Sequence, residues 1–324
     1  MRRRGALRAA AASALALGLT ATFPLAAGAA GTVAFTIRDS RITENSGMAR
    51  DTTNGVYWTV DDSGSVGVVY GVDGTGQVKG VLRYNALPVD TEAVAWSRNR
   101  LYVGDIGDNT GTRKTIRVYW FDDPSPNDRT RTYRAWDFRY PDGPHDAETL
   151  LVSPSGRLYV ATKELRGGLY RAPEAPSASG VNQLTRVGDV PSTLTDGVYL
   201  PGGRQIAYLT YAKVLVLDAA SGAERGSADV GVTQAEALAV GLDGTSLLVG
   251  GEGRSSKVAS MPVPGVPSPS PSPSPSPGGS DAEPDTASTP VARQRGTYLA
   301  VGLAGLVAVV AGLVVAVVRR PDQA

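Results

Sequence analysis

The fold is decided by the stretch Pro88–Trp120, PVDTEAVAWSRNRLYVGDIGDNTGTRKTIRVYW, which contains the clearest copy of a pattern that recurs along the chain. Glu92 opens a short apolar run, the turn SRNR follows, the aromatic run LYVG returns, and Asp105 begins a second acidic cluster. The pattern predicts an antiparallel hairpin, in which the first strand starts where the second strand ends. We therefore expect Glu92 and Asp105 to lie side by side at one end of the hairpin.

The same pattern occurs five times, at intervals of 40 to 56 residues. Each copy begins with an acidic residue, and the five openings are Glu44, Glu92, Glu148, Asp196 and Glu236. Short strand-like runs follow, separated by turns rich in Gly, Pro, Asn and Asp, and no run between Arg38 and Met261 has a helical period. Four such strands at this period are typical of a β-propeller blade.

The fifth copy stops after its third strand, where a Pro-rich segment begins. A spare strand, VAFTIRD (Val33–Asp39), precedes the first copy and has no local partner. If this strand completes the last blade, two exposed sheet edges disappear at once. We therefore predict an all-β, five-bladed β-propeller closed by its N-terminal strand. A β-sandwich pair also gives many short strands, but it does not predict five acid-led hairpins.

Both ends of the chain have the composition of targeting segments. Residues 1–30 have a basic start, an apolar stretch and small residues, as a signal peptide does. Residues 297–318 are apolar and long enough to form a transmembrane helix, with two arginines directly after them. Residues 262–296, with their Ser-Pro repeats, predict a semi-rigid extracellular linker.

These segments leave residues 31–261 as the propeller ectodomain and residues 319–324 as a cytoplasmic tail. We expect a single-pass protein of the cell membrane with its propeller outside the cell. The formal net charge of +1 gives no sign of nucleic-acid binding. The chain has no cysteine and a single histidine, His145, which excludes disulfides, thiol nucleophiles and Cys/His zinc sites.

Several motifs occur in a fixed order: SGMA, WTVDDSG, LYVGDIGDN, YPDG, DAETLLV, LYVATK, LTY and AEALAV. This set resembles a family of secreted bacterial propeller proteins, common in actinobacteria, that read SGLA, NDSG, LYVGDIGDN, YPDG, DAEAL, TK, RTY and EA. More loosely, the chain resembles WD40-like and phytase-like propellers. The resemblance implies the propeller fold and no particular activity. The chain departs from the family pattern at Leu209, where an arginine is usual, which puts an anion contact from that blade in doubt.

If each blade begins at the central channel, the five opening acids surround one mouth of it. We predict a ligand site there, formed by Glu44, Glu92, Glu148, Asp196 and Glu236 together with His145 and Lys163. So many carboxylates repel one another unless a cation binds, their pKa values rise, or Lys163, Arg113 and Arg117 neutralise them. The other possibility is that the acids accept hydrogen bonds from backbone amides and hold the ring together.

Oxygen ligands without histidine or sulfur favour Ca²⁺ over zinc. The candidate ligands of such an ion are Asp61, Asp105, Asp108, Asn109, Glu92 and Glu148. The loop GDIGDN is also a common turn sequence, and His145 is either a general base or a turn residue. The four tryptophans, Trp58, Trp96, Trp120 and Trp136, are expected to pack between blades.

Two functions follow from this pattern, and no catalytic residue is identified for either. The first is a binding module for an extracellular ligand or cell-surface partner, since propellers present loops on a rigid ring. The second is a Ca²⁺-dependent hydrolase of phosphate or ester substrates, in which a ring carboxylate activates water. A phosphate enzyme needs several arginines or lysines at the same mouth.

Overall fold

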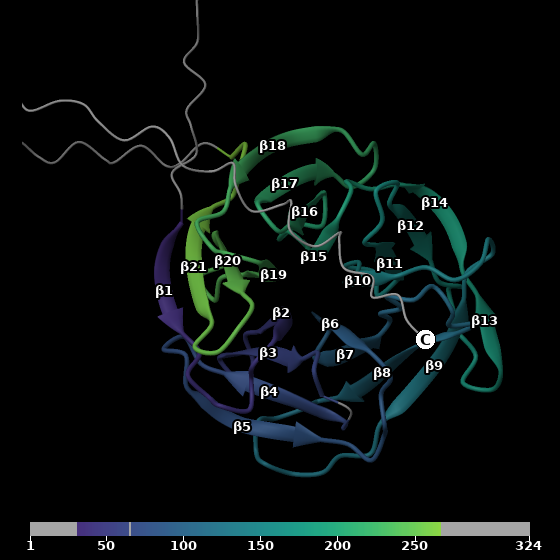
Figure 1. Cartoon of the computed structure of the whole chain (residues 1–324), viewed down its shortest axis with the longest axis horizontal. Coiled ribbons are helices and arrows are strands. Elements are labelled where there is room, and N and C mark those ends of the chain that lie inside the picture. Colours follow the sequence, from purple (N-terminus) through teal and green to yellow (C-terminus); the bar gives the residue numbers. More distant parts are fainter. Residues whose placement is uncertain (1–30, 65, 267–324) are drawn as a thin grey trace, which may run out of the picture. The chain divides into compact units, whose positions relative to one another are not determined.

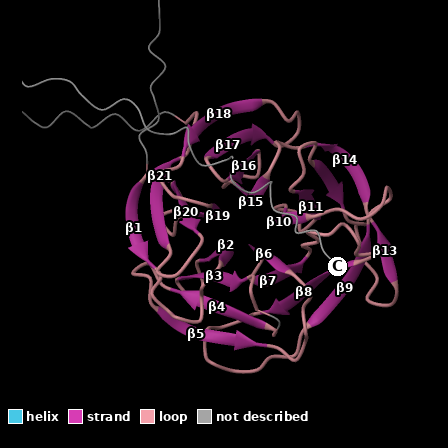
Figure 2. Ribbon diagram, in the orientation of Figure 1, coloured by secondary structure: helices cyan, strands magenta, loops and turns pink. Residues whose placement is uncertain are grey.

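The computed structural model describes residues 31–64 and 66–266, and its β-strands form five sheets around a central axis (Figure 1). No helix occurs in these residues, and Figure 2 shows strands and loops only. The chain is therefore an all-β, five-bladed propeller, as the repeat pattern predicts. The predicted signal peptide, transmembrane helix and cytoplasmic tail lie outside the described residues, as does nearly all of the linker. Within the described part, no helix is long and apolar enough to cross a membrane.

Blade 1 consists of β2 (Asn45–Asp51), β3 (Val56–Asp61), β4 (Val68–Val72) and β5 (Val78–Arg83). Blade 2 consists of β6 (Thr91–Ser97), β7 (Arg100–Asp105), β8 (Ile116–Asp122) and β9 (Arg134–Arg139). Blade 3 consists of β10 (Ala147–Val152), β11 (Leu158–Thr162), β12 (Gly168–Arg171) and β14 (Thr185–Asp189). Blade 4 consists of β15 (Leu194–Tyr199), β16 (Gln205–Thr210), β17 (Lys213–Asp218) and β18 (Glu224–Asp229).

Blade 5 shows how the ring closes. It contains β19 (Ala235–Val240), β20 (Ser246–Gly251) and β21 (Lys257–Pro262), and its outer strand is β1 (Thr32–Thr36) from the start of the propeller. β1 pairs with β21 in antiparallel fashion, with Thr36 opposite Lys257. The predicted closure by the N-terminal strand is therefore confirmed. Pairing covers an edge that each strand exposes when alone.

One strand departs from the simple plan. β13 (Val181–Gln183) lies between the third and fourth strands of blade 3 in the sequence, but it pairs in parallel with β9 of blade 2. Blade 2 thus has five strands, and the outer strand of blade 3 begins later, at Thr185. The Asn182 side chain fixes this short strand, since its amide nitrogen donates to the carbonyl of Asp137 at 3.0 Å.

The innermost strands are buried on both faces because each is flanked by two neighbouring blades. Every residue of β10 and of β19 is buried, which explains why their sequences, AETLLV and AEALAV, do not alternate between polar and apolar. Apolar side chains of adjacent blades pack between the sheets, and Trp58 is fully buried there as predicted. The core therefore lies between blades, and the channel edge of each innermost strand is left for polar contacts.

The contribution of the closing strand can be measured at Phe35, which is buried and stacks on Tyr57 with ring centroids 6.0 Å apart. We expect Phe35→Leu to lower the free energy of unfolding by about 1 kcal/mol, because an aromatic pair is lost while the site stays apolar. Val33→Ala on the same strand is the control, since Val33 is exposed. Urea unfolding measures both; equal effects of the two changes would contradict a packed closing strand.

Candidate functional site

The acidic mouth of the channel is set by a bulge at the start of every innermost strand. In β6, β10 and β19 the extra residue is a glutamate: Glu92, Glu148 and Glu236, respectively. A bulge redirects the side chain of its extra residue. These three buried glutamates occupy equivalent positions in three blades, and Asp105 pairs with the residue next to Glu92, as the hairpin pattern predicted.

The prediction of one equivalent acid per blade is wrong for blades 1 and 4. The bulge residue of β2 is Gly47, and that of β15 is Thr195. A β-carbon at Gly47 would lie 2.9 Å from the backbone nitrogen of Val94, so blade 1 approaches blade 2 too closely for a side chain. The Thr195 hydroxyl instead donates to the carbonyl of Ala235 at 2.7 Å and ties blade 4 to blade 5.

A second layer of acids lies in loops at the same mouth, and all of its members are half-buried. Glu44, Asp90 and Asp146 directly precede innermost strands, whereas Asp62 and Glu252 directly follow the second strands β3 and β20. Asp90 was not among the predicted site residues. Its signal in the sequence is a spacing, because Asp90 precedes Glu92 by two residues as Asp146 precedes Glu148. The carboxylate of Asp146 also accepts a hydrogen bond from the amide of Asp108 at 2.8 Å.

Crowding makes these carboxyls hard to ionise. Burial and the nearby charges of Glu148, Asp90 and Asp62 raise the pKa of Glu92 to about 9. Burial and the adjoining Glu44 carboxyl raise the pKa of Asp62 to about 8. Burial and the charge of Glu252 raise the pKa of Glu236 to about 7. At neutral pH the mouth therefore holds protons that ordinary carboxyls would have released.

Lys163 is a cation held inside this acidic mouth. Its ammonium group pairs with the Glu148 carboxylate and lies 5.1 Å from the centre of the Tyr211 ring. Burial disfavours the charge of Lys163, but the pairing with Glu148 outweighs burial and raises the pKa of the lysine. The arrangement of a carboxylate, an aromatic face and further acids is one that favours ammonium groups.

Asp61 and Asp105 occupy equivalent positions at the ends of β3 and β7, and both bind backbone amides. Asp61 Oδ1 accepts from the amides of Thr43 and Glu44, each at 2.6 Å. Asp105 Oδ1 accepts from the amide of Asp90 at 3.0 Å. These two acids hold the loops that enter the innermost strands. They therefore match the second possibility considered from the sequence, in which acids accept hydrogen bonds from backbone amides.

The loop GDIGDN, part of the predicted calcium site, is an internally bonded turn. Asp108 accepts from the amides of Thr112 at 3.0 Å and Arg113 at 2.7 Å, while Asn109 is exposed. Arg113 also forms an ion pair with Asp105 at 2.8 Å. Within residues 31–64 and 66–266, no three Asp, Glu or His side chains are placed to hold a metal ion together. The predicted calcium site stays a prediction, and Asp108 and Asp105 are engaged here by backbone amides and by Arg113.

Asp196 lies deeper than the mouth, in the middle of the channel. Its carboxylate accepts from the amide of Leu238 at 2.6 Å, of Gly197 at 2.7 Å and of Met48 at 3.2 Å. These amides belong to blades 5, 4 and 1, so the side chain crosses the channel and joins three innermost strands. Burial raises the pKa of Asp196 well above its usual range. We infer a bracing role for Asp196, in place of the predicted position in the ligand ring.

His145 precedes β10 and is engaged through both ring nitrogens. Nδ1 lies 2.7 Å from Glu164 Oε1, and Nε2 lies 3.0 Å from Asp142 Oδ1. Burial opposes its charge, but the hydrogen bonds with Glu164 and Asp142 raise the pKa of His145. The Tyr170 hydroxyl donates to Asp142 at 2.8 Å and completes the cluster. His145 thus joins the loop before β10 to the loop after β11.

No protein-family model and no curated protein matches the chain in sequence. Among solved structures, it is similar to a gluconolactonase from Xanthomonas campestris, with 15% identity over 71% of this chain and 89% of that one and a TM-score of 0.45. It is also similar to the β-propeller domain of Cps50 (Swd1) from Myceliophteria thermophila, with 17% identity over 75% and 71% of the two chains and a TM-score of 0.41. A luciferin-regenerating enzyme shares 10% identity over 70% of this chain and 95% of its own, with a TM-score of 0.43. Likeness at this level concerns the propeller fold alone.

Proposed function

We propose that this propeller is a binding module whose acidic mouth takes a cationic group of an extracellular ligand or partner. The observation that carries the proposal is the position of Lys163, whose ammonium group lies between the Glu148 carboxylate and the Tyr211 ring. This lysine is an internal example of the group that the mouth accommodates. Glu92 and Glu236, with raised pKa values, stand at equivalent positions in two other blades.

Exposed apolar side chains surround the same mouth and support a role in binding. In each blade, two kinds of loop lie on the side where the innermost strand begins: the loop that joins the second strand to the third, and the loop that follows the fourth strand. The apolar residues on these loops are Val66 (58% exposed), Leu87 (80%), Val89 (74%), Leu165 (84%) and Tyr211 (38%). Apolar groups clustered at one face of a soluble domain are typical of an interaction site. The ligand is therefore expected to have an apolar flank beside its cationic group.

We propose further that the module is displayed outside the cell on a C-terminal membrane anchor. Support for this comes from the sequence patterns of residues 1–30, 262–296 and 297–318. The ordered motifs from SGMA to AEALAV also support membership in the secreted actinobacterial propeller family that the chain resembles. The Pro-rich linker would then hold the mouth away from the membrane surface.

The binding proposal is tested with a short peptide of leucine and lysine and with its lysine-acetylated form. We expect the cationic peptide to bind at least about tenfold more tightly, because acetylation removes the charge that the carboxylates stabilise. Glu236→Gln should weaken binding by a similar factor. Glu224→Gln on exposed β18 is the matched control and should have no effect. Calorimetric titration measures all four affinities.

The affinity should also rise with pH. Glu236, Asp62 and Glu92 have pKa values of about 7, 8 and 9, so a cation that binds at pH 6 must displace protons. At pH 9 that cost is largely gone, and we expect tighter binding and less proton release.

Equal affinity for the two peptides would contradict the proposal. Hydrolysis of phosphate or ester substrates that is lost in Glu92→Gln and Glu148→Gln would favour the hydrolase prediction. Calcium dependence of that activity would support the predicted calcium site.

A further inference from the structure

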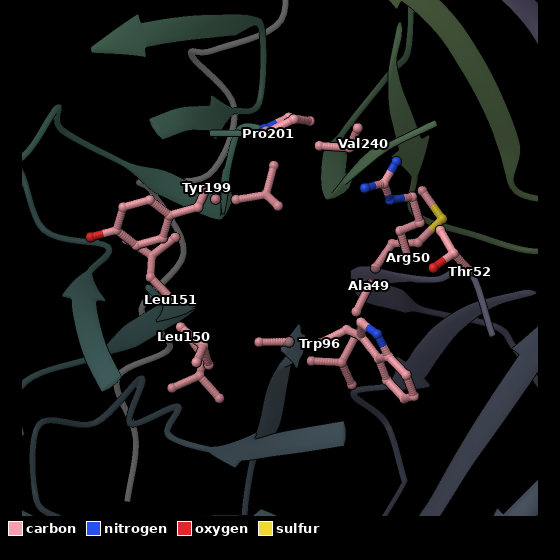
Figure 3. A pocket seen from close by; sticks show the side chains of 15 residues that line it. Ala49, Arg50, Thr52, Trp96, Leu150, Leu151, Tyr199, Pro201 and Val240 are labelled. Atoms are coloured by element: carbon pink, nitrogen blue, oxygen red, sulfur yellow. The ribbon is translucent and has the colours of Figure 1, made fainter. Parts of the chain in front are cut away.

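A pocket opens at the other mouth of the channel, where the innermost strands end. Its volume is about 160 Å³, and every blade contributes to its wall. A cavity of about 150 Å³ with an apolar lining is large enough to hold benzene. Figure 3 shows Trp96, Leu150, Tyr199 and Val240 around the opening, with Arg50 between Val240 and Ala49. The pocket therefore has room for one small ring.

This pocket is separate from the acidic mouth. Met48 and Gly197 belong to its lining, and their amides bind the carboxyl of Asp196 that crosses the channel. Strand direction places Thr52 and Pro201, which also line the pocket, at its outer end. A ligand at this mouth would thus meet apolar side chains together with polar groups of the lining residues, and it would not meet the glutamates at the start of the strands.

Arg50 is the one charged residue in the lining of this pocket. Its Nη1 donates to the carbonyl of Gly241 at 3.1 Å, and no acidic side chain of the described residues forms an ion pair with it. Trp96, predicted to pack between blades, is half-buried and forms part of the wall. A guanidinium beside an apolar pocket is suited to a planar anion, which it can bind through two parallel hydrogen bonds.

The turns around this mouth carry further arginines. Arg98, Arg157 and Arg204 lie in the turns that follow innermost strands, and Arg157 forms an ion pair with Glu174 at 3.1 Å. The acids in these turns, or directly before them, are Asp51 and Asp243. Asp243 is occupied by the amides of its own turn, which lower its pKa to about 2. The two mouths of the channel thus differ in chemistry. Carboxyl groups crowd one of them, whereas Arg50 is the one charged residue that lines the pocket at the other, here called the basic mouth.

We propose that the basic mouth binds a small aromatic carboxylate, with its ring between Trp96, Leu150 and Tyr199 and its carboxylate on Arg50. The apolar side chains of the lining account for the ring, since burying apolar surface is favourable and non-directional. Arg50 supplies the orientation and the preference for an anion. This site does not depend on the cation-binding function proposed for the opposite mouth.

The test uses phenylacetate and the neutral comparator benzyl alcohol, titrated into the full-length protein. We expect phenylacetate to bind at least about tenfold more tightly, because only the acid makes charge-assisted bonds with Arg50. Arg50→Gln should abolish this preference, and Arg50→Lys should retain part of it. Arg171→Gln, at an exposed arginine of β12, is the matched control and should bind like the wild type.

Fluorescence gives a readout confined to the pocket, since Trp96 is the tryptophan that lines it. Phenylacetate should change the emission of the wild type and should fail to change it in Trp96→Phe. Thermal melting of each variant confirms that it is folded, and Arg50→Lys remains informative if Arg50→Gln is not. The proposal is overturned if phenylacetate does not bind at millimolar concentration, or if Arg50→Gln keeps the preference for the acid.

Discussion

Glu92→Gln is expected to raise the free energy of unfolding by about 2 kcal/mol at pH 9 and to change it little at pH 5. Glu92 is 4% exposed and lies among Asp62, Asp90 and Glu148. Burial and these charges raise its pKa to about 9, so its carboxyl is neutral at pH 5 and begins to ionise only under alkaline conditions. Glutamine has nearly the same shape as the neutral acid and acquires no charge.

The direction of the effect follows from proton binding. In the unfolded chain Glu92 has the ordinary glutamate pKa of 4.5, whereas in the folded protein its pKa is raised to about 9. Between these two values the folded state binds more protons, so the free energy of unfolding falls as the pH rises. An isolated group with this shift would lose roughly 6 kcal/mol, at about 1.4 kcal/mol for each unit. We expect about a third of that, since the neighbouring acids share the repulsion and keep part of it in the variant.

Denaturant unfolding at pH 5, 7 and 9 measures the prediction. The wild type should lose stability steadily across this range, and Glu92→Gln should lose less. Glu224→Gln serves as the control because Glu224 is exposed on β18. β18 is the outermost strand of blade 4, so this residue lies away from the channel. If the pH profiles of Glu92→Gln and the wild type run parallel, Glu92 is not the strained carboxyl that the geometry indicates.

The sequence predicts the ring better than it predicts individual strands. Four strands in each repeat and a missing strand in the last repeat are enough to specify five blades closed by β1, because both follow from counting local patterns. β13 could not be predicted in this way. It has three residues, and each of them pairs with a residue of β9 that is 44 positions earlier in the chain, for example Asn182 opposite Phe138. Such a pairing depends on tertiary contacts, which period and propensity do not contain.

The same distinction between local patterns and tertiary contacts applies to the residues of the candidate site. Glu92, Glu148 and Glu236 could be predicted because each opens a repeat and sits on a local bulge. Gly47 could not, since it is required by the close approach of blade 2 to blade 1. The basic pocket was missed for a related reason. Its wall takes one or more apolar residues from each of five blades, and every one of them, Trp96 included, looks like ordinary core in the sequence.

Asp196→Ala is expected to destabilise the protein by about 3 to 5 kcal/mol. The Asp196 carboxyl accepts from the amides of Met48, Gly197 and Leu238, and it is 1% exposed. Alanine leaves three buried donors without an acceptor, and each such loss costs about 1 to 3 kcal/mol. Without the carboxyl of Asp196 at these three amides, water must enter or the blades must shift.

Asp196→Asn separates hydrogen bonding from packing. Asparagine keeps the size of the side chain, but one of its two terminal atoms is a nitrogen that donates, and it would face amides that also donate. We therefore expect a loss of stability between that of the wild type and that of Asp196→Ala. Asp229→Ala is the control, because Asp229 forms an exposed ion pair with Lys213 and should contribute less than about 1 kcal/mol. Hydrogen exchange identifies the cause: the amides of Met48 and Leu238 should lose protection in both Asp196 variants. Unchanged protection of these amides would show that the channel is not held together by Asp196, and the three innermost strands would then have to be joined by side-chain packing alone.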